Sequence, residues 1–273
     1  MRHSRAIFDR NGLAGVIEAL LLVALVAIVI SVIQLQYIPQ VMEQREAEHM
    51  DQISNQFATL KSMIDLQAIT NSSAPISTMI TLGSRELPYF VTVGSSGTLR
   101  TYEYNDSYLN ISYNYFVCPL TSIQYESENY YFIDQSYILE GGGIIVAQAS
   151  GEPVMRVDPS IHVVNRTNDL DIYWTLPIIK GISGKNMTSG NGKCFIRTNW
   201  SKGQVVSIPD ANSIYIRTRY PNAWYEAMQS RLSSNVQYDV GTTYLEITEK
   251  TKRINVYLSY YYIYTQIGIG WIK

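Results

Sequence analysis

Few residues in this sequence are of the types that carry out catalysis, and those few are scattered along the chain. The three histidines, His3, His49 and His162, have no partners nearby in sequence at the spacings of a metal site or a catalytic triad. No His-Glu-x-x-His motif and no Gly-x-Ser-x-Gly motif occurs. We therefore expect that this protein is not an enzyme and needs no cofactor.

Three segments look like functional motifs only superficially. Gly190–Cys194 lacks the first glycine of a phosphate-binding loop, because Met187 occupies that position, and we expect a hairpin turn there. Gly141–Gly143 precedes an apolar run and is expected to form another turn. Asn168–Asp171 offers oxygen ligands of the kind that calcium prefers, but the rest of a calcium-binding loop is missing. Calcium binding is therefore the weaker interpretation of that segment.

The most unusual ionisable residue is Glu18, which lies within the apolar run from Leu13 to Ile33. As a helix this run would be about 31 Å long, which matches the hydrocarbon core of a bilayer. An acidic side chain inside a bilayer costs about 2.5 kcal/mol or more, so such a residue usually has a partner or a function. The alternative is that Glu18, which lies near the start of the run, extends to the lipid headgroups.

Basic residues set the orientation of this membrane segment. Arg2, Arg5 and Arg10 precede the run and are offset only by Asp9, so the positive-inside rule places the N-terminus in the cytoplasm and the remainder outside. A cleaved secretory signal peptide is the rival interpretation, but its apolar core is usually about 7–15 residues long and ends at an Ala-x-Ala-like site. Gln34–Tyr37 offers no such site. We expect a retained segment that crosses the membrane once.

The residues that follow the membrane segment are expected to continue as a helix. Pro39 permits a kink, and residues 41–69 are rich in the helix formers Glu, Gln, Met and Ala. Apolar residues recur there at spacings of three and four, which predicts one apolar stripe made of Met50, Ile53, Phe57, Leu60 and Ile64. The charged residues fall mostly off this stripe, namely Glu43, Arg45, Glu46, Glu48, Asp51 and Lys61. The stripe is too short to predict a coiled-coil stalk.

From about Thr70 the sequence changes to a β-rich pattern. Asn71–Pro75 breaks the helix, and Tyr220–Leu232 fits one short helix. Runs rich in Val, Ile, Tyr and Thr recur between turn residues, at 89–93, 108–117, 144–148, 161–164, 172–176, 204–208, 213–218, 243–247 and 254–263. We predict an α+β fold, in which a long N-terminal transmembrane and amphipathic helix precedes an all-β, antiparallel sandwich-like extracellular domain with one short helix.

Glycosylation motifs and cysteines both indicate an exterior location. Asn-x-Ser/Thr acceptors for N-glycosylation are more frequent than the composition alone would give, and all follow the membrane segment, at Asn71, Asn105, Asn110, Asn165, Asn186 and Asn199. Cys118 and Cys194 fit the same compartment. They either form one disulfide, worth about 3–5 kcal/mol, or remain two buried thiols.

The remaining composition bears on partners. The 22 tyrosines suit half-buried strands first, and contacts with other subunits or with surface glycans second. A net charge of −2 gives no support for a nucleic-acid partner.

The junction Asn11–Glu18, with the sequence NGLAGVIE, resembles the leader junction of type IV pilin-like proteins, especially archaeal pilins. Members of that family have a short basic leader (a class III signal peptide), a glycine at the cleavage site, and a hydrophobic helix with a small or acidic residue in its first turns. A softer similarity to larger archaeal pilin-like ectodomains covers Gly141–Val146 and Val154–Pro159. The resemblance implies a filament-core helix and a large β ectodomain.

The resemblance also implies how the chain is processed. A prepilin peptidase would cut after Gly12, so that Leu13 becomes the new N-terminus and Glu18 pairs with the free amine of a neighbouring subunit. Gly15 is a second candidate for the cut, with Val16 as the new N-terminus. The expected domains are a basic leader (1–12), a transmembrane or filament-core helix (13–37), an amphipathic extension (38–69) and a β-rich extracellular head (70–273).

These features predict a structural subunit, major or minor, of an archaeal type IV pilus-like surface filament. It would be assembled by the pilus machinery through self-association of its N-terminal helix, and would serve adhesion or surface attachment. The alternative is a single-pass, signal-anchored surface binding protein that does not polymerise. An anchored enzyme would need a convergent polar site that the sequence does not reveal. The leader separates the first two hypotheses, because a pilin releases it and an anchor keeps it.

Overall fold

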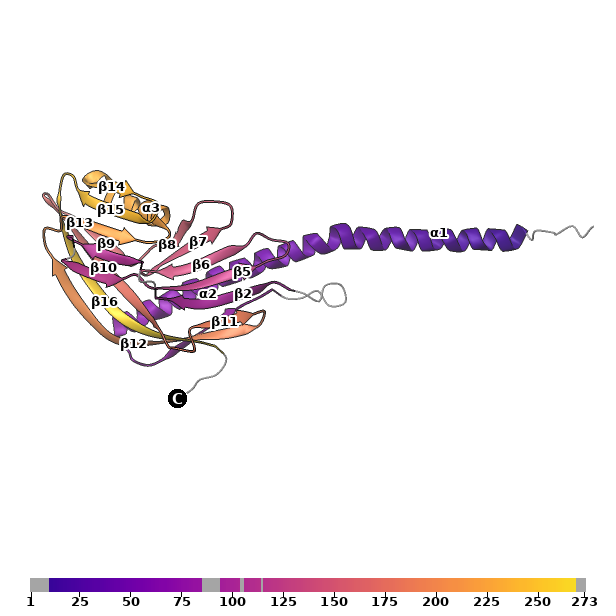
Figure 1. Ribbon diagram of the computed structural model, residues 1–273, viewed down its shortest axis with the longest axis horizontal. Helices are drawn as coiled ribbons and strands as arrows, with labels where there is room; N and C mark the ends of the chain where they lie inside the picture. Colours follow the sequence, from indigo (N-terminus) through magenta and orange to yellow (C-terminus); the bar gives the residue numbers. More distant parts are fainter. Residues whose placement is uncertain (1–9, 85–93, 104–105, 114, 269–273) are drawn as a thin grey trace, which may run out of the picture.

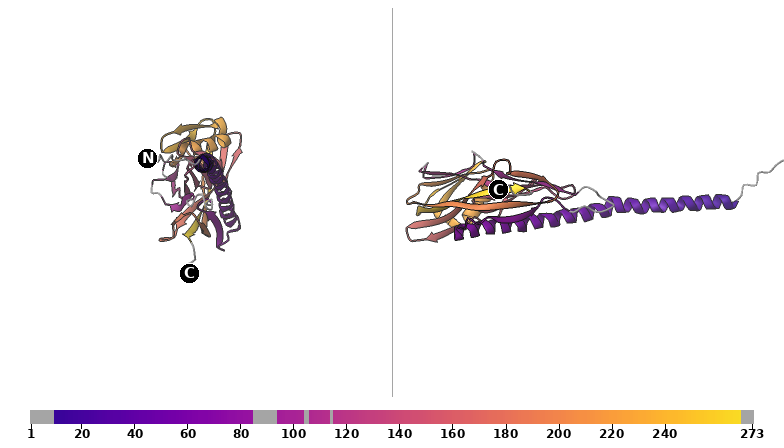
Figure 2. Two further views of the ribbon diagram at one scale, coloured as in Figure 1. Left: turned by 90° about the vertical axis from the view of Figure 1, so that its right-hand side faces the viewer. Right: turned by 90° about the horizontal axis from the view of Figure 1, so that it is seen from below.

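A helix that projects from a β-rich head gives the molecule an elongated shape in the computed structural model (Figure 1). The structure describes residues 10–84, 94–103, 106–113 and 115–268. The helix consists of α1 (Arg10–Val32), the π-helical turn η1 (Ile33–Tyr37) and α2 (Ile38–Thr70). α2 lies along the head, whereas α1 extends beyond it (Figures 1 and 2). The predicted α+β class, with a long N-terminal helix ahead of a β-rich domain, is confirmed.

Pro39 explains why the helix changes form between α1 and α2. Proline has no backbone N–H, and in a regular helix its ring clashes with the carbonyl group four residues earlier. The chain adopts η1 just before it, where the N–H of Ile38 donates to the carbonyl oxygen of Ile33, five residues back. This wider turn accommodates the proline ring at the start of α2. The helix axis changes direction at the same place (Figure 1).

α2 ends at Thr70 because the next residue, Asn71, adopts the left-handed conformation with φ of 48°. Asparagine is one of the few residues that adopt this conformation readily. The N–H groups of Asn71 and Ser72 donate to the carbonyl oxygens of Ala68 and Gln67, at 3.4 and 3.2 Å. These bonds satisfy carbonyl groups that would otherwise lack partners at the helix end.

Three sheets make up the described part of the head. The first contains the longest strands, in the order β1 (Ile76–Thr81), β12 (Lys193–Ile208), β16 (Arg253–Gly268), β10 (Asp169–Gly181) and β9 (Ile161–Asn165). The second has the order β11 (Met187–Gly190), β2 (Ser96–Tyr102), β5 (Ser122–Glu128), β6 (Gln135–Glu140), β7 (Gly143–Gln148) and β8 (Val154–Val157). The third has the order β14 (Val236–Val240), β15 (Tyr244–Glu249), β13 (Ser213–Arg217), β3 (Tyr108–Ile111) and β4 (Phe116–Pro119).

One pairing in the first sheet departs from the predicted antiparallel pattern. β10 and β16 run parallel, from Asp169 opposite Arg253 to Gly181 opposite Thr265. The other strand pairs within the described ranges are antiparallel. Parallel neighbours need a long crossover, and here the chain from β11 to β15 supplies it.

Two apolar clusters of described residues form the core. The first lies between α2 and the first and second sheets, and it contains every residue of the predicted stripe, each at most 2% exposed. The second lies against the third sheet and includes α3 (Pro221–Leu232), which is followed by the short 3-10 helix η2 (Ser233–Asn235). In this cluster the rings of Trp224 on α3 and Trp174 on β10 have centroids 5.7 Å apart. The predicted stripe and the predicted short helix are both confirmed.

Most predicted strands are confirmed with altered bounds. Residues 108–117 span the hairpin of β3 and β4, residues 204–208 are the end of the long β12, and residues 89–93 lie outside the described ranges. The two turns predicted from glycine connect β6 to β7 and β11 to β12. At the first of them Gly141 and Gly142 have φ of 57° and 85°, which glycine adopts without steric cost.

Candidate functional site

The most prominent functional feature is the exposed apolar surface of α1. Leu20, Leu21 and Leu25 are between 62% and 66% exposed, and from Gly15 onward none of the most apolar stretch is buried against the head. Leucine, valine, isoleucine and alanine occur on all sides of the helix, so no single face is selected for packing. By length and composition this helix can cross a membrane.

Glu18 is the only acidic residue in α1. It is exposed, and within the described part of the chain no hydrogen bond or ion pair connects it to another side chain. Gly15 lies three residues earlier on the same side of the helix, and no heavy atom lies within 4 Å of the position that a side-chain Cβ would occupy there. A second helix could therefore approach closely beside Glu18.

The candidate cleavage sites lie inside α1. Gly12 and Leu13 belong to its first turn, and Gly15 and Val16 follow one turn later. A peptide bond in a helix has to leave the helical conformation before a peptidase can cut it, and the first turn of a helix opens most readily. The position of Gly12 is therefore compatible with processing after local unwinding.

Polar contacts add to the apolar stripe in fixing α2 to the head. The Glu46 carboxylate is completely buried and accepts the backbone N–H groups of Tyr130, Tyr131 and Phe132, at 3.1, 2.7 and 2.7 Å. Near the other end of α2, the Gln67 side chain donates to the carbonyl oxygen of Thr198 at 3.1 Å. These bonds connect the helix to the second and first sheets, so α2 is held along its length.

Two of the charged residues that were predicted to lie mostly off the apolar stripe, Glu46 and Lys61, are buried. Glu46 is buried because the loop between β5 and β6 folds over it, and Lys61 is buried because it lies between Asp65, at 2.6 Å, and Ser160, at 3.3 Å. Their partners are distant in sequence or on the next turn of the helix. The apolar stripe alone therefore could not reveal them.

His49 is a further buried polar residue on α2. Its Nε2 lies 3.0 Å from the carbonyl oxygen of Thr81, while its Nδ1 is buried without a hydrogen-bond partner in the described structure. Burial lowers the pKa of His49, against the smaller opposing effects of Thr81 and Glu46. The residue packs edge-on against Tyr125, with ring centroids 6.3 Å apart. It serves the contact between α2 and the sheets.

The candidate glycosylation sites differ in accessibility. Asn71, Asn165, Asn186 and Asn199 are exposed, and Asn105 lies outside the described ranges. Asn110 is half-buried in β3, where it pairs with β13 on one side and β4 on the other. The exposed sites are better acceptors than Asn110, because an acceptor asparagine has to lie on an accessible surface segment.

The two cysteines lie in different parts of the core. Cys118 is on β4 in the cluster next to the third sheet, and Cys194 is on β12 in the cluster around α2. Both are free and buried, and burial raises the pKa of each thiol to about 12. The structure therefore has the second of the two predicted alternatives, a pair of buried thiols, and their raised pKa makes them unreactive.

The acidic segment near residue 170 is occupied by protein partners. Asp171 accepts a hydrogen bond from the Asn255 amide at 2.8 Å and another from the Arg166 guanidinium, and these contacts lower its pKa. Asp169 pairs with Arg253 at 3.0 Å. Within the residues that the structure describes, no group of three metal-binding side chains occurs.

Comparisons of the chain with protein-family models, with curated proteins and with solved structures find no match.

Proposed function

We propose that this chain is a structural subunit of a type IV pilus-like surface filament, held in a membrane and then assembled through α1. The observation that carries the proposal is the projection of α1 beyond the head with its apolar side chains exposed on all sides (Figure 1). Each Leu, Ile or Val side chain contributes about 1.5–3 kcal/mol when it is fully removed from water. Lipid tails or neighbouring helices have to cover this surface.

Glu18 favours neighbouring helices over lipid alone. A carboxylate has to be paired or neutralised when it is transferred into an apolar environment, and this chain provides Glu18 with no partner among the described residues. If a prepilin peptidase cuts after Gly12, the new amine of Leu13 on an adjacent subunit supplies one. Gly15 beside it leaves room for the close approach of that subunit.

The attachment of α2 to the sheets suits a load-bearing role. Apolar packing along the stripe and the bonds of Glu46 and Gln67 make the helix and the head one body. A force applied to the head is then transmitted to α1 without unfolding a linker. This arrangement is expected of a subunit whose head is exposed and whose helix lies in a filament core.

N-terminal peptide mass spectrometry on sheared and membrane fractions of the native cell surface tests processing. A mature terminus at Leu13 or Val16 in the sheared fraction is expected. An intact leader found only in the membrane fraction would reject assembly and leave the alternative, a signal-anchored surface protein that does not polymerise.

Substitution of Glu18 tests the assembly step. Glu18→Ala is expected to reduce filament yield by roughly tenfold or more, because it removes an ion pair from an apolar environment. The matched control is Glu43→Ala, which removes an exposed carboxylate from α2. Unchanged filament yield in Glu18→Ala, with the leader still removed, would eliminate the proposed role of Glu18.

A further inference from the structure

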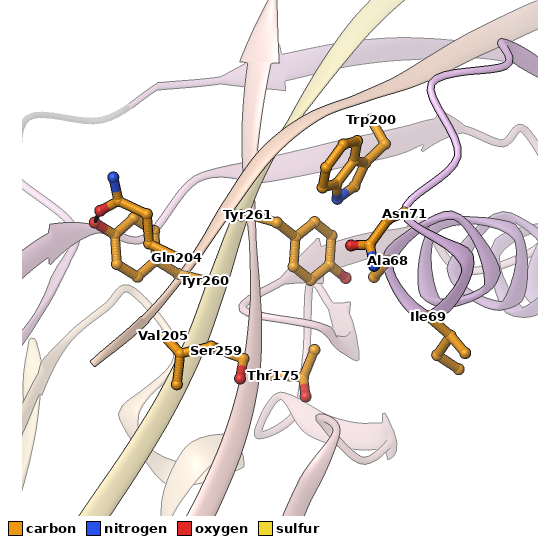
Figure 3. Close-up of a pocket in the computed structure, with 11 residues that line it drawn as sticks. Ala68, Ile69, Asn71, Thr175, Trp200, Gln204, Val205, Ser259, Tyr260 and Tyr261 are labelled. Atoms are coloured by element: carbon orange, nitrogen blue, oxygen red, sulfur yellow. Dashed lines mark hydrogen bonds between the residues drawn. The ribbon is translucent and has the colours of Figure 1, made fainter. Parts of the chain in front are cut away.

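The head contains a pocket at the end of α2, far from α1. It encloses about 410 Å³ between the last turn of α2 and strands β10, β12 and β16 of the first sheet (Figure 3). α2 has 33 residues, which corresponds to about 50 Å between its first residue and this pocket. With α1 in a membrane or filament core, the pocket lies on the part of the head that faces the surroundings.

The pocket forms where α2 stops covering the sheet. On β16, Ser259 and Tyr261 lie on the face that packs against α2, and Thr175 of the neighbouring β10 lies beside them. On β12 a β-bulge places one extra residue between Trp200 and Gly203, opposite Ile263 and Tyr261. Because Gly203 has no side chain, the bulge leaves space beside the Trp200 ring and the Tyr261 Cβ, which would lie 3.8 and 3.5 Å from a Cβ at this position.

The lining combines aromatic rings with uncharged polar groups. Trp200 and Tyr261 lie on the same side as Asn71 and the end of α2, whereas Gln204 and Tyr260 lie apart and hydrogen-bond to each other (Figure 3). Asn71, Thr175 and Ser259 supply an amide and two hydroxyl groups. Among the described lining residues there is no Asp, Glu, Lys, Arg or His. Such a site selects a neutral ligand that has both apolar faces and hydrogen-bonding edges.

The Tyr261 hydroxyl is an independent sign of a missing partner. The residue is 4% exposed, and its hydroxyl is buried with no hydrogen-bond partner in the described structure. A buried hydroxyl without a hydrogen-bond partner destabilises the folded state. Figure 3 shows this hydroxyl directed toward Asn71 and Ala68 at the end of α2, which is the edge of the pocket. Because the hydroxyl is buried, a ligand group reaches it only when Asn71 moves aside, and it then provides the missing acceptor.

The stacked tyrosines of the third sheet do not offer such a surface. On the third sheet Tyr215 stacks between Tyr108 and Tyr244, with ring centroids 6.0 and 5.3 Å apart. Both faces of the Tyr215 ring are therefore covered by its neighbours. On the pocket side of the first sheet, Tyr257 and Tyr173 continue the aromatic surface beyond Ser259, with centroids 4.8 Å apart.

We infer that this pocket binds a neutral hexopyranose unit of a saccharide. A pyranose ring has apolar C–H faces, one of which stacks on the partly exposed Trp200. The hydroxyl groups at its edge bond to Asn71 and Thr175, and to the Tyr261 hydroxyl once Asn71 moves aside. The inference rests on the proposed function only in that the head has to be displayed outside the cell. In a surface filament, saccharide binding by this pocket would attach the ends of the heads to neutral glycans.

Saturation-transfer NMR on the full chain in nanodiscs tests this, with protein produced without N-glycosylation so that no glycan on Asn71 fills the pocket. The probes are the methyl glycosides of glucose, galactose, mannose and N-acetylglucosamine, with methyl glucuronide as the charged comparison. We expect saturation of at least one neutral glycoside and much weaker saturation of the glucuronide. Absence of saturation for every neutral glycoside, or saturation of an apolar tripeptide alone, would overturn the inference.

Three variants show whether this pocket is responsible. Trp200→Ala is expected to weaken binding by roughly tenfold, and Tyr130→Ala, which removes a 67% exposed aromatic ring near the opposite end of α2, is expected to leave it unchanged. Tyr261→Phe is expected to raise the melting temperature and yet weaken binding severalfold, a combination that a purely structural role would not produce. Equal affinity of Trp200→Ala and the unsubstituted chain would reject the pocket.

A further arm identifies the source of the saccharide in the native host. Ser73→Ala removes the acceptor motif of Asn71 without altering Asn71 itself. Stronger binding by Ser73→Ala than by the native chain would support the sugar specificity and show that the chain's own glycan competes for the pocket. Saccharide binding is measured on unassembled protein, so it is independent of assembly. Binding can be absent in a chain that loses its leader and forms filaments, and it can be present in a chain that does neither.

Discussion

In α1, Leu20 and Leu21 are 63% and 66% exposed, whereas in α2 Phe57 and Leu60 have no exposed surface at all. Both segments belong to one nearly continuous helix, interrupted only by η1. α2 has an apolar stripe matched to two sheets and a polar side matched to water, so its partners are within the chain. α1 is apolar on every side and has no partner within the described part of the head. The comparison indicates that α2 stabilises the head, whereas the exposed α1 is left for the assembly that we propose.

The largest expected difference between the two segments is in core packing. Phe57→Ala should lower the free energy of unfolding of the head by about 3–5 kcal/mol, because it leaves a cavity among buried side chains. Leu21→Ala, in α1, should change it by less than about 0.5 kcal/mol. Denaturant unfolding in detergent, followed by near-ultraviolet circular dichroism, measures both. A similar loss in the two variants would mean that α1 also stabilises the head.

Buried polar contacts on α2 should give the next largest effect. Glu46→Ala leaves the N–H groups of Tyr130, Tyr131 and Phe132 without their acceptor and should lower the free energy of unfolding by roughly 3 kcal/mol. Glu43→Ala, on the exposed side of the same helix, should have almost no effect. Hydrogen exchange of these three amides should accelerate only in Glu46→Ala. Unchanged exchange would show that the loop does not depend on Glu46.

A third glutamate sharpens the contrast between buried and exposed carboxylates. Glu140 on β6 is 2% exposed, and burial raises its pKa from 4.5 to about 7, although it accepts hydrogen bonds from Thr218 at 2.6 Å and Trp224 at 2.9 Å. The folded state therefore binds this proton more tightly than the unfolded state. The stabilisation of the folded head by the protonated Glu140 carboxyl is present below about pH 4.5. It is lost as pH rises to about 7, by roughly 3 kcal/mol in total.

Glu140→Gln tests this linkage, because glutamine keeps an oxygen acceptor and has no charge. The free energy of unfolding of the unsubstituted chain relative to Glu140→Gln should fall between pH 4.5 and 7 and then level off. Unfolding curves recorded at several pH values measure this difference. A difference that stays constant with pH would mean that Glu140 has an ordinary pKa in the folded head.

The smallest expected effect concerns Glu18. Glu18→Gln should leave the melting temperature of the head unchanged, since no contact connects Glu18 to the head in the described structure. Differential scanning calorimetry in detergent measures it. A shift of several degrees would contradict the separation of stability and assembly between α2 and α1.

Local sequence patterns were enough for the features that depend on neighbouring residues. The apolar stripe of α2, the short helix α3 and the glycine turns follow from periodicity and from conformational preferences within a few residues. The separation of α1 from the head follows in the same way. A helix that is apolar on every side has no single apolar stripe that would pack against the head.

Features that depend on distant partners were not accessible in this way. The parallel pairing of β10 with β16 and the lengths of β12 and β16 depend on strands that meet only in the folded head. Burial of Glu46 depends on a loop 84 to 86 residues away. The pocket beside Tyr261 arises from three strands and a helix end, and the bulge that opens it at Gly203 has no local signature apart from the glycine.

The π-helical turn has a consequence for direction. An α-helix advances about 100° around its axis per residue. In η1 the backbone hydrogen bond spans five residues in place of four, so the rotation per residue is smaller there than in the segments on either side. The azimuth of Glu18 relative to the head is therefore set at residues 33–37, not by α1 itself. In a filament built from this chain, that single turn would fix the rotation of each head about its helix axis.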